Sequence, residues 1–524
     1  MTQQQASSPA GSPERTGTLI IGSGFSGLGM AVELRRRGDT DFVILERAKA
    51  VAGTWRDNQY PGCACDVESH LYSYSFEPET SWSRAFAPWD EIRAYIERCT
   101  DKYDLRRHVR FDADVEHAQF DEPSGTWTVR TRQGATYRAR NVVTASGGLS
   151  NPAYPNLPGL DRFEGEKFHS AEWKHDVDLT GKRVAVIGTG ASAIQFVPEI
   201  QPRVKQLNLF QRTPPWVMPK PDFEFSETRK WLFRHLPIFA LLYRFWLYFK
   251  NEMRVLAFKN HSTILRALMG LGEKYIAACV KKPELRQKLT PTYTPGCKRI
   301  LMSNNYYQSL DQANVDVITD GIAEVRPRSI VTHDGRELDV DVIIYGTGFK
   351  VQDNLGAMRF IGRNGADLGE RWAQGASAYL GTSVPDFPNL YMLLGPNTGL
   401  GHTSMILMLE SQVRYISHAI RLMKKQALSF IDVRRDVYER YNQWLQERLK
   451  DTVWASGCQS WYLNQNGKNT TAWPGFTFTF RWLTRRVRLA DYTLQPLPTP
   501  STASSTSDAP ARDMEPAHVA AQPG

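Results

Sequence analysis

The chain has 524 residues, of which 41% are hydrophobic, and a formal net charge of +9 at neutral pH. This length suits two or three domains, and the hydrophobic content together with 14 tryptophans predicts a large packed core. The basic excess comes partly from short runs such as residues 35–37. No nucleic-acid-binding motif accompanies these runs, so nucleic acid is not an expected partner.

The two ends of the chain and the cysteines set further limits. Residues 1–16 are polar and lack the apolar core of a signal peptide, and residues 495–524 are rich in Pro, Ser, Thr and Ala. We predict that both are disordered tails. The six cysteines form no CxxC pair and no zinc-type spacing, which predicts reduced thiols in a cytoplasmic protein without a metal site. The absence of a redox cysteine pair also argues against a disulfide reductase.

A first glycine-rich loop follows an apolar strand predicted at 18–21 and begins a helix that runs through residue 37. Such glycines allow a tight turn and a close approach of the backbone to a pyrophosphate, which the N–H groups of the helix N-terminus then bind. The next strand, 42–45, ends at Glu46, whose carboxylate can accept hydrogen bonds from both hydroxyls of a ribose. This arrangement indicates FAD or NAD rather than NADP. The loop residues expected at the dinucleotide are Gly22, Gly24, Phe25, Ser26 and Gly27.

A second loop of the same kind follows the strand predicted at 183–187. No acidic residue follows the next strand, 207–210. Arg212 stands there instead, and a guanidinium can bind a 2′-phosphate with two parallel hydrogen bonds. This half is therefore predicted to bind NADPH, with Thr213 and Lys298 as further candidates for the phosphate; a solvated surface arginine is the alternative. The loop residues expected at the cofactor are Gly188, Thr189, Gly190, Ala191 and Ser192.

The order of these segments predicts an α/β fold with two Rossmann-like dinucleotide-binding domains, the NADPH domain being inserted in the FAD domain. We expect the FAD domain at 17–150 and 341–494 and the NADPH domain at 151–340. The strand at 341–345 is expected to return the chain to the FAD domain, with the crossings near 150–175 and near 335–345. Two dinucleotides held face to face suit hydride transfer from a nicotinamide to a flavin.

An apolar segment at 236–249 lies within a helical insertion expected at about 222–290. The segment is too short to span a bilayer and contains Arg244, so no transmembrane segment is predicted. We expect it to pack on the rest of the protein, where it could line the path of the substrate. Peripheral contact with a membrane, useful for an oily substrate, is the alternative.

Three further segments resemble those of type I Baeyer–Villiger monooxygenases, which are class B flavoprotein monooxygenases. Residues 163–173 match the signature FxGxxxHxxxW, and residues 52–66 match [AG]GxWxxxx[FY]PGxxxD in full. Residues 296–307 resemble the segment that carries the active-site arginine of the family. The family usually has Pro or Asp after the signature tryptophan, where this chain has Lys174. The resemblance covers most of residues 17–480, and the stretch 395–404 is similar to a branch that oxidises acetophenone and alkyl ketones.

The resemblance implies an NADPH- and O2-dependent enzyme that converts ketones to esters or lactones through a C4a-peroxyflavin. The implied catalytic arginine is Arg299, a permanent cation beside the peroxide and the oxyanion, and Asp66 orients it. A surface ion pair and a helix N-cap are the alternatives for these two residues. Two other functions stay open: a flavin-containing monooxygenase that oxidises N or S atoms, and a flavin redox sensor without turnover.

The remaining expectations concern the surroundings of the cofactors. Trp55 is expected near the flavin ring, and Trp461 resembles a family tryptophan that contacts NADP from a mobile loop. Thr54 and Tyr72 are further candidates for contacts with FAD. His169 is expected to have a structural role in a linker between the domains rather than to transfer a proton. The substrate is expected to be a linear aliphatic or aryl-alkyl ketone, and the oligomeric state is left open between a monomer and a dimer.

Overall fold

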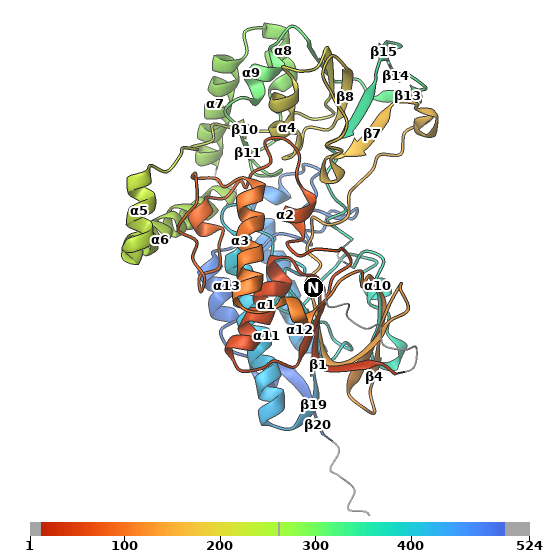
Figure 1. The fold of residues 1–524 in the computed structure, drawn as a ribbon, viewed down its shortest axis with the longest axis vertical. Coiled ribbons are helices and arrows are strands. Elements are labelled where there is room, and N and C mark those ends of the chain that lie inside the picture. The colour runs from red at the N-terminus through yellow and green to blue at the C-terminus, as the bar shows by residue number, and fades with distance from the viewer. Residues whose placement is uncertain (1–11, 260–261, 354, 498–524) are drawn as a thin grey trace, which may run out of the picture.

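The computed structural model describes residues 12–259, 262–353 and 355–497. Two sheet-centred domains lie end to end, and the chain passes from the lower one to the upper one and back (Figure 1). The predicted tails lie mostly outside the described residues. Their inner ends do not: residues 14–16 belong to the first strand and residues 495–496 to the last one, so both predicted tails were too long by a few residues.

The first domain is built on an eight-stranded sheet with the order β17-β4-β5-β6-β1-β2-β3, in which β18 also pairs with β6. Strands β1, β2 and β6 are parallel and their inner residues are buried on both faces, as their apolar sequences require. The strands are β1 (Glu14–Ile21), β2 (Phe42–Leu45), β3 (Val109–Arg110), β4 (Val115–Asp121), β5 (Thr126–Thr131), β6 (Thr136–Thr144), β17 (Arg359–Ile361) and β18 (Leu390–Met392).

Helices cover this sheet and join both halves of the domain. Helix α1 follows β1 directly and packs against α11, which comes from the C-terminal half of the chain. Strands β19 and β20 form a separate antiparallel pair at the lower end (Figure 1). These elements are α1 (Phe25–Arg36), α2 (Thr54–Asp57), α3 (Trp89–Lys102), α10 (Leu368–Arg371), α11 (Met405–Lys425), β19 (Leu428–Val433), α12 (Arg435–Lys450), α13 (Thr477–Leu483) and β20 (Tyr492–Pro496).

The second domain contains a five-stranded parallel sheet with the order β12-β9-β8-β16-β7. A small three-stranded antiparallel sheet and a short two-stranded pair accompany it. The elements are β7 (Glu166–His169), β8 (Arg183–Ile187), α4 (Ala193–Ile200), β9 (Gln206–Phe210), β10 (Val217–Met218), β11 (Leu301–Met302), α9 (Tyr306–Leu310), β12 (Val315–Ile318), β13 (Ile322–Arg326), β14 (Ser329–Thr332), β15 (Glu337–Asp339) and β16 (Val342–Tyr345).

Two sequence expectations about the domain crossings are wrong. Strand β16 does not return the chain to the first domain, because it lies between β7 and β8 in the second sheet. Its apolar residues are buried there on both faces, and the chain crosses back only after Tyr345. His169 does not lie in a linker, since it is the last residue of β7. The two crossing segments run side by side, and the Ala153 N–H donates a hydrogen bond to the Gly348 carbonyl at 2.9 Å.

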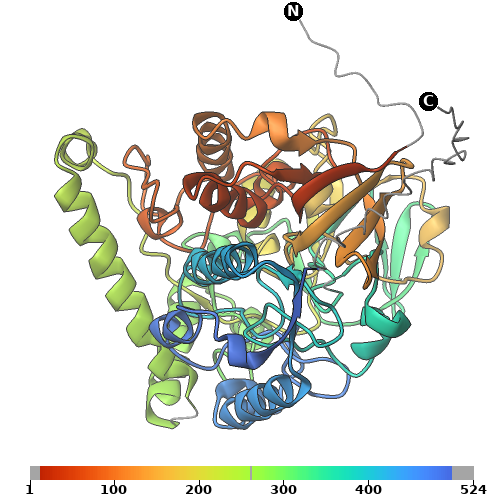
Figure 2. The ribbon, with the colours of Figure 1, turned by 90° about the horizontal axis from the view of Figure 1, so that it is seen from below.

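The helical insertion lies along one side of the molecule, where Figure 2 shows its green helices at the left edge. Among the described residues, no helix combines the length and the apolar character that a bilayer-spanning helix needs. The long helix α6 departs from expectation, because most of its large apolar side chains are exposed. Its buried residues are two apolar ones, Ala240 and Leu247, and two polar ones, Asn251 and Glu252. The insertion contains α5 (Glu227–His235), α6 (Pro237–Met253), α7 (Ser262–Cys279) and α8 (Pro283–Leu289).

Candidate functional site

The first glycine loop turns the chain from β1 into α1. Gly22 has a φ of +107°, and a Cβ at this position would lie 2.6 Å from the Ala145 carbonyl oxygen, so only glycine fits. Gly24 is the N-cap of α1 and supplies no capping side chain. The N–H groups of the first helical turn, at Phe25, Ser26 and Gly27, are therefore directed at the loop and can bind an anion there.

Glu46 lies beside this loop, directly after β2, and is buried. Its Oε2 accepts hydrogen bonds from the Ser23 N–H at 2.9 Å and the Ser23 hydroxyl at 2.6 Å. Its Oε1 lies 3.0 Å from Nη1 of Arg56, a neighbour that the sequence analysis did not single out. A ribose in the predicted position would share the carboxylate with Ser23 and Arg56.

Aromatic side chains enclose the other side of the first loop. Gly53 approaches Gly24, and the helix α2 that follows contains Thr54 and Trp55. The Trp55 indole Nε1 donates a hydrogen bond to the Tyr72 hydroxyl at 3.2 Å, and the ring centroids of Tyr72 and Phe25 lie 5.2 Å apart. The structure thus brings together the loop and the two aromatic residues that the sequence placed near the flavin.

The second glycine loop repeats the geometry of the first. Gly188 has a φ of +103°, and a Cβ there would lie 2.5 Å from the Gly346 carbonyl oxygen. Helix α4 begins after Ser192, which forms no capping hydrogen bond, so its first N–H groups are also open to an anion. Gly190 and Ala191 lie between these points. Two such turns, each with an uncapped helix start, fit the pyrophosphates of two dinucleotides.

Two cations lie near one another beyond the second loop. Arg212 follows β9 and is exposed, and Lys298 reaches it from a distant segment, 4.9 Å above the Tyr293 ring. Burial, and then the positive charge of Arg212, lowers the pKa of Lys298. The Thr213 carbonyl accepts a hydrogen bond from the Thr189 hydroxyl at 3.4 Å, which places Thr213 at the same end of the loop. The structure therefore brings together all three residues that the sequence proposed for a 2′-phosphate.

A direct contact joins the two domains between the loops. Gln195 of α4 donates a hydrogen bond to the Ala64 carbonyl at 3.0 Å and accepts one from the Ala64 N–H at 3.2 Å. It also accepts a hydrogen bond from the Tyr60 hydroxyl at 3.1 Å. The segment 52–66 thus contacts the second domain as well as the first glycine loop. Gln195 was not among the predicted site residues, although the match at 52–66 contains its partner Tyr60.

Asp66 and Arg299 form an ion pair from segments 233 residues apart. The Arg299 Nε donates a hydrogen bond to the Asp66 Oδ2 at 2.7 Å, and its Nη1 lies 3.4 Å from the Leu400 carbonyl. The side chains are 27% and 31% exposed, so both can still contact a ligand. The next helical segment along the chain, Ser69–Leu71, has Glu68 as its N-cap, which excludes the N-cap alternative for Asp66.

The charges around this pair keep both residues ionised. Burial alone would raise the pKa of Asp66, but the Arg299 guanidinium and the more distant Lys220 ammonium hold it below its ordinary value. The Asp66 carboxylate in turn raises the pKa of Arg299. Lys220 was missed by the sequence analysis, and it lies 4.0 Å from Asp222 with 15% of its side chain exposed. Lys220 provides a second positive charge near Asp66.

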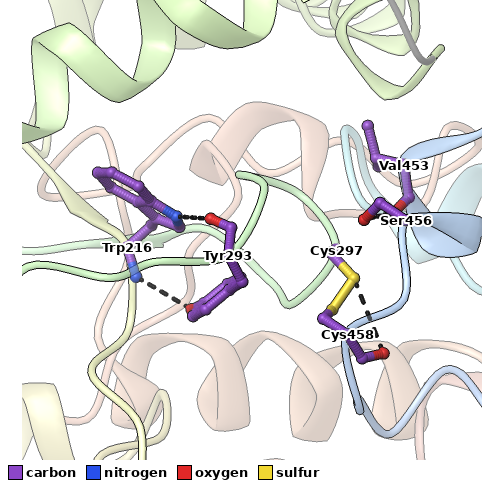
Figure 3. The surroundings of a disulfide bond; sticks show 6 residues. All are labelled: Trp216, Tyr293, Cys297, Val453, Ser456 and Cys458. Atoms are coloured by element: carbon purple, nitrogen blue, oxygen red, sulfur yellow. Dashed lines mark hydrogen bonds between the residues drawn. A yellow bond between two sulfur atoms is a disulfide. The ribbon is translucent and has the colours of Figure 1, made fainter.

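The C-terminal loop that carries Trp461 is covalently attached to the arginine segment. A disulfide joins Cys297, two residues before Arg299, to Cys458 (Figure 3). The prediction of six reduced thiols is therefore wrong for this pair, because folding brings together two cysteines that lie 161 residues apart. Cys63, Cys65, Cys99 and Cys279 are free.

Trp461 lies three residues after Cys458, next to Tyr462. Trp461 is 39% exposed and stacks on Tyr462 with a centroid distance of 4.1 Å. Tyr462 is buried, and its pKa is raised by burial while the charge of Arg299 opposes the shift. Tyr462 therefore lies between Trp461 and the Arg299–Asp66 pair, which the sequence analysis did not predict.

His169 has no position from which it could transfer a proton to the pair. It is fully buried at the end of β7, where its Nδ1 accepts a hydrogen bond from the Ala171 N–H at 3.1 Å. Its ring packs against Tyr154 and Phe349 of the two crossing segments. Burial lowers the pKa of His169, so it is neutral at physiological pH. Its contacts are those of a structural residue at the junction of the domains.

Comparison with known proteins identifies the family. A family model described as pyridine nucleotide-disulphide oxidoreductase matches residues 19–231. A Baeyer–Villiger monooxygenase of Pseudomonas aeruginosa is 52% identical over 481 residues and covers 91% of each chain. One from Streptomyces coelicolor is 50% identical over 488 residues, covering 93% of this chain and 94% of the relative. The chain belongs to the Baeyer–Villiger monooxygenase family. It is therefore a flavoprotein monooxygenase that uses FAD and NADPH, as the sequence predicted.

Solved structures of the family agree with this fold. A steroid monooxygenase bound to NADP superposes with a TM-score of 0.83 at 30% identity, covering 92% of this chain and 100% of that one. A closed form of cyclohexanone monooxygenase has a TM-score of 0.84 at 27% identity, covering 93% and 100%. The predicted fold class, with two dinucleotide-binding domains, is confirmed.

Proposed function

We propose that this enzyme inserts one oxygen atom of O2 next to the carbonyl of a ketone, giving an ester or lactone, with NADPH as the reductant. Bound FAD supplies hydride acceptance and oxygen activation. The protein binds and orients the two cofactors and places a positive charge at the reacting oxygen. The observation that carries the proposal is the Arg299–Asp66 ion pair, held at 2.7 Å where the two domains meet.

Ketone oxygenation requires charge stabilisation at that point. Attack on a ketone carbonyl develops negative charge on its oxygen, and a preorganised guanidinium stabilises that charge more in the transition state than in the ground state. Asp66 holds the Arg299 side chain through Nε, and Nη1 has one long contact to the Leu400 carbonyl. The rest of the guanidinium is therefore available to a ligand. We infer that Arg299 is the catalytic cation and that Asp66 positions it.

The second domain is proposed to select NADPH through its cations. Arg212 and Lys298 lie near one another at the end of the second loop, and no acidic residue follows β9. A 2′-phosphate there would gain charge-assisted hydrogen bonds and relieve the repulsion between the two cations. At the first loop, Glu46 would repel a 2′-phosphate, so FAD is proposed to bind there. Trp461 and Tyr462 are proposed to cover the nicotinamide side.

The substrate, the cellular location and the oligomeric state of the enzyme are further proposals. The proposed substrates are linear aliphatic or aryl-alkyl ketones, from the likeness of residues 395–404 to a branch with such members. The P. aeruginosa and S. coelicolor relatives are named for the same type of oxidation, which supports a ketone. We also propose that the enzyme works in the cytoplasm, where NADPH is regenerated, and that it is a monomer or a dimer.

The test uses the purified FAD-loaded enzyme, a panel of ketones and NADPH. Products are identified by gas chromatography, and NADPH consumption is followed in parallel with and without ketone. Ester or lactone formation that matches ketone-stimulated NADPH consumption would support the proposal. Sulfoxides or N-oxides without any ester would favour a flavin-containing monooxygenase, and no stimulation by any oxidisable compound would favour a redox sensor.

A further inference from the structure

Helix α6 presents a row of large apolar side chains to solvent. Ile238, Leu241, Leu242, Phe245 and Phe249 are 55%, 60%, 56%, 64% and 59% exposed. Their spacing of three and four residues places them along one face of the helix. Most surface helices of soluble proteins turn such a face towards the core. Figure 1 shows α5 and α6 at the edge of the molecule, where α6 lies away from both sheets.

Polar contacts hold the opposite face of α6 to the protein. The Arg244 guanidinium donates hydrogen bonds to the His70 carbonyl, to the Ser73 hydroxyl at 3.1 Å and to the Ser73 carbonyl at 3.0 Å. The Asn251 amide donates to the buried Glu68 carboxylate at 2.7 Å, and the Lys250 ammonium pairs with the same carboxylate at 2.7 Å. These contacts fix the rotation of the helix, so the outward direction of the apolar row is built into the structure.

Neighbouring helices extend the apolar surface. On α5, Trp231 is 56% exposed, and the rings of Phe233 and Tyr243 stack at 5.5 Å to join α5 to α6. On α13, Phe478 and Trp482 are 53% and 55% exposed. The Thr477 hydroxyl donates a hydrogen bond to the Glu252 carboxylate at 2.9 Å, which joins α13 to the other end of α6. We call these exposed side chains of α5, α6 and α13 the apolar surface. Contiguous exposed apolar patches of this kind mark binding sites for proteins or membranes.

The charges at the rim of the apolar surface are mainly positive. Exposed cations lie on α5 and on α13 with the turn after it: Arg229, Arg234, Arg481, Arg485 and Arg486. On the three helices and within three residues of their ends, the acidic residues are the exposed Glu224, Glu227, which pairs with Lys230 at 2.8 Å, and the buried Glu252. An apolar surface with large aromatic residues and a cationic rim has the composition of helices that lie in the interface of anionic membranes.

We propose that the apolar surface docks the enzyme peripherally on an anionic phospholipid bilayer. The apolar row of α6 enters the boundary between headgroups and acyl chains, and the arginines at the rim face the lipid phosphates. A second copy of the chain fits less well, because a two-fold interface would place the cationic rim against itself. Docking does not depend on the proposed ketone chemistry. It does place the membrane close to the site, since Glu68, which anchors α6, is two residues from Asp66.

The test is flotation of the full-length, FAD-loaded enzyme with vesicles of phosphatidylcholine, with or without phosphatidylglycerol. We expect binding to the anionic vesicles that weakens as the salt concentration rises. Phe245→Ser should lower the partition coefficient about tenfold, because it removes an exposed aromatic ring that the bilayer would bury. Arg485→Gln should lower it about fivefold. Leu494→Ser is the matched control, since it replaces a side chain that is 37% exposed on β20, away from α6.

Flavin content and thermal unfolding of each variant confirm that it is folded, and the altered residues are exposed enough for this to be expected. Absence of flotation with anionic vesicles at low salt would overturn the proposal. Equal decreases in vesicle binding for Phe245→Ser and Leu494→Ser would also overturn the proposal. A dimer by light scattering that Phe245→Ser converts to monomer, without vesicle binding, would assign the apolar surface to self-association instead.

Discussion

Replacing Arg299 with alanine tests the central pair directly. A unit charge about 4 Å from a developing negative charge contributes about 4 kcal/mol at an effective dielectric constant near 20. This value agrees with the loss of about 2.7–4 kcal/mol that follows removal of one oxyanion donor, which is a rate factor of about a hundred to a thousand. The side chains of Arg299 and Asp66 are less than a third exposed, so solvent screens this contribution only in part.

The two half-reactions should respond differently to Arg299→Ala. Hydride transfer from NADPH needs both cofactor loops but no stabilised oxyanion, so bleaching of the flavin by NADPH should continue. Ester formation should fall by about a hundred- to a thousandfold, and NADPH should be consumed with release of hydrogen peroxide. Stopped-flow absorbance measures the first step, and gas chromatography with a peroxide assay measures the second. Arg203→Ala, which removes an exposed arginine paired with Asp178 at 3.4 Å, is the matched control and should leave both steps unchanged.

Ester formation by Arg299→Ala at near wild-type rate would refute this reasoning. Another residue would then stabilise the oxyanion, and the Arg299–Asp66 contact would be a structural ion pair. Failure of the variant to bind FAD would be a different result, since it would mean that the pair supports the fold. Flavin content is therefore measured first.

Arg212→Ala should raise the KM for NADPH about ten- to a hundredfold and leave that for NADH nearly unchanged in steady-state assays; equal effects on both would contradict the assignment. Cys458→Ser should lower the free energy of unfolding by about 2–5 kcal/mol and increase proteolysis of the loop around Trp461, because it removes a cross-link over 161 residues; a denaturant titration that matches the wild type would contradict it. Burial, with the nearby Asp386 carboxylate, raises the pKa of Asp432 to about 7. The free energy of unfolding of the wild type should therefore fall by up to about 1.4 kcal/mol per pH unit as the pH rises from about 4 to about 7. Asp432→Asn should remove this slope from a plot of stability against pH, and an unchanged slope would show that Asp432 is not its source.

The sign of the pH effect predicted for Asp432 follows from the linkage between proton binding and folding. A carboxyl group whose pKa is higher in the folded protein than in the unfolded chain binds more protons when folded. Its protonation therefore favours folding at low pH, and this contribution disappears as the pH rises through the folded pKa. Asp66 behaves in the opposite way, because the Arg299 guanidinium lowers its pKa despite burial. The contribution of that pair is present above the ordinary carboxyl pKa of about 4 and is lost only at more acidic pH.

The sequence by itself determined the features that depend on local backbone geometry. Gly22 and Gly188 have φ values of +107° and +103°, in turns where a Cβ would collide with a neighbouring carbonyl, so the glycine pattern predicts the turns and the helices after them. The contiguous match at 52–66 placed Trp55 and Asp66 on one segment. The apolar segment 236–249 was also predicted to be part of a helical insertion, as α6 is, although the sequence did not predict which way the helix faces.

Only the tertiary structure decided which distant segments meet. Gln195 contacts Ala64, Lys220 adds its charge near Asp66, and Cys297 forms a disulfide with Cys458, yet none of these pairs is close in sequence. The apolar strand β16 would suit either sheet, and its place in the second one depends on the edges that β7 and β8 leave for it. Local preference is set by the neighbours of a residue along the chain. Long-range pairing depends instead on the surface, charge and hydrogen bonds that the rest of the folded protein offers, which no single segment contains.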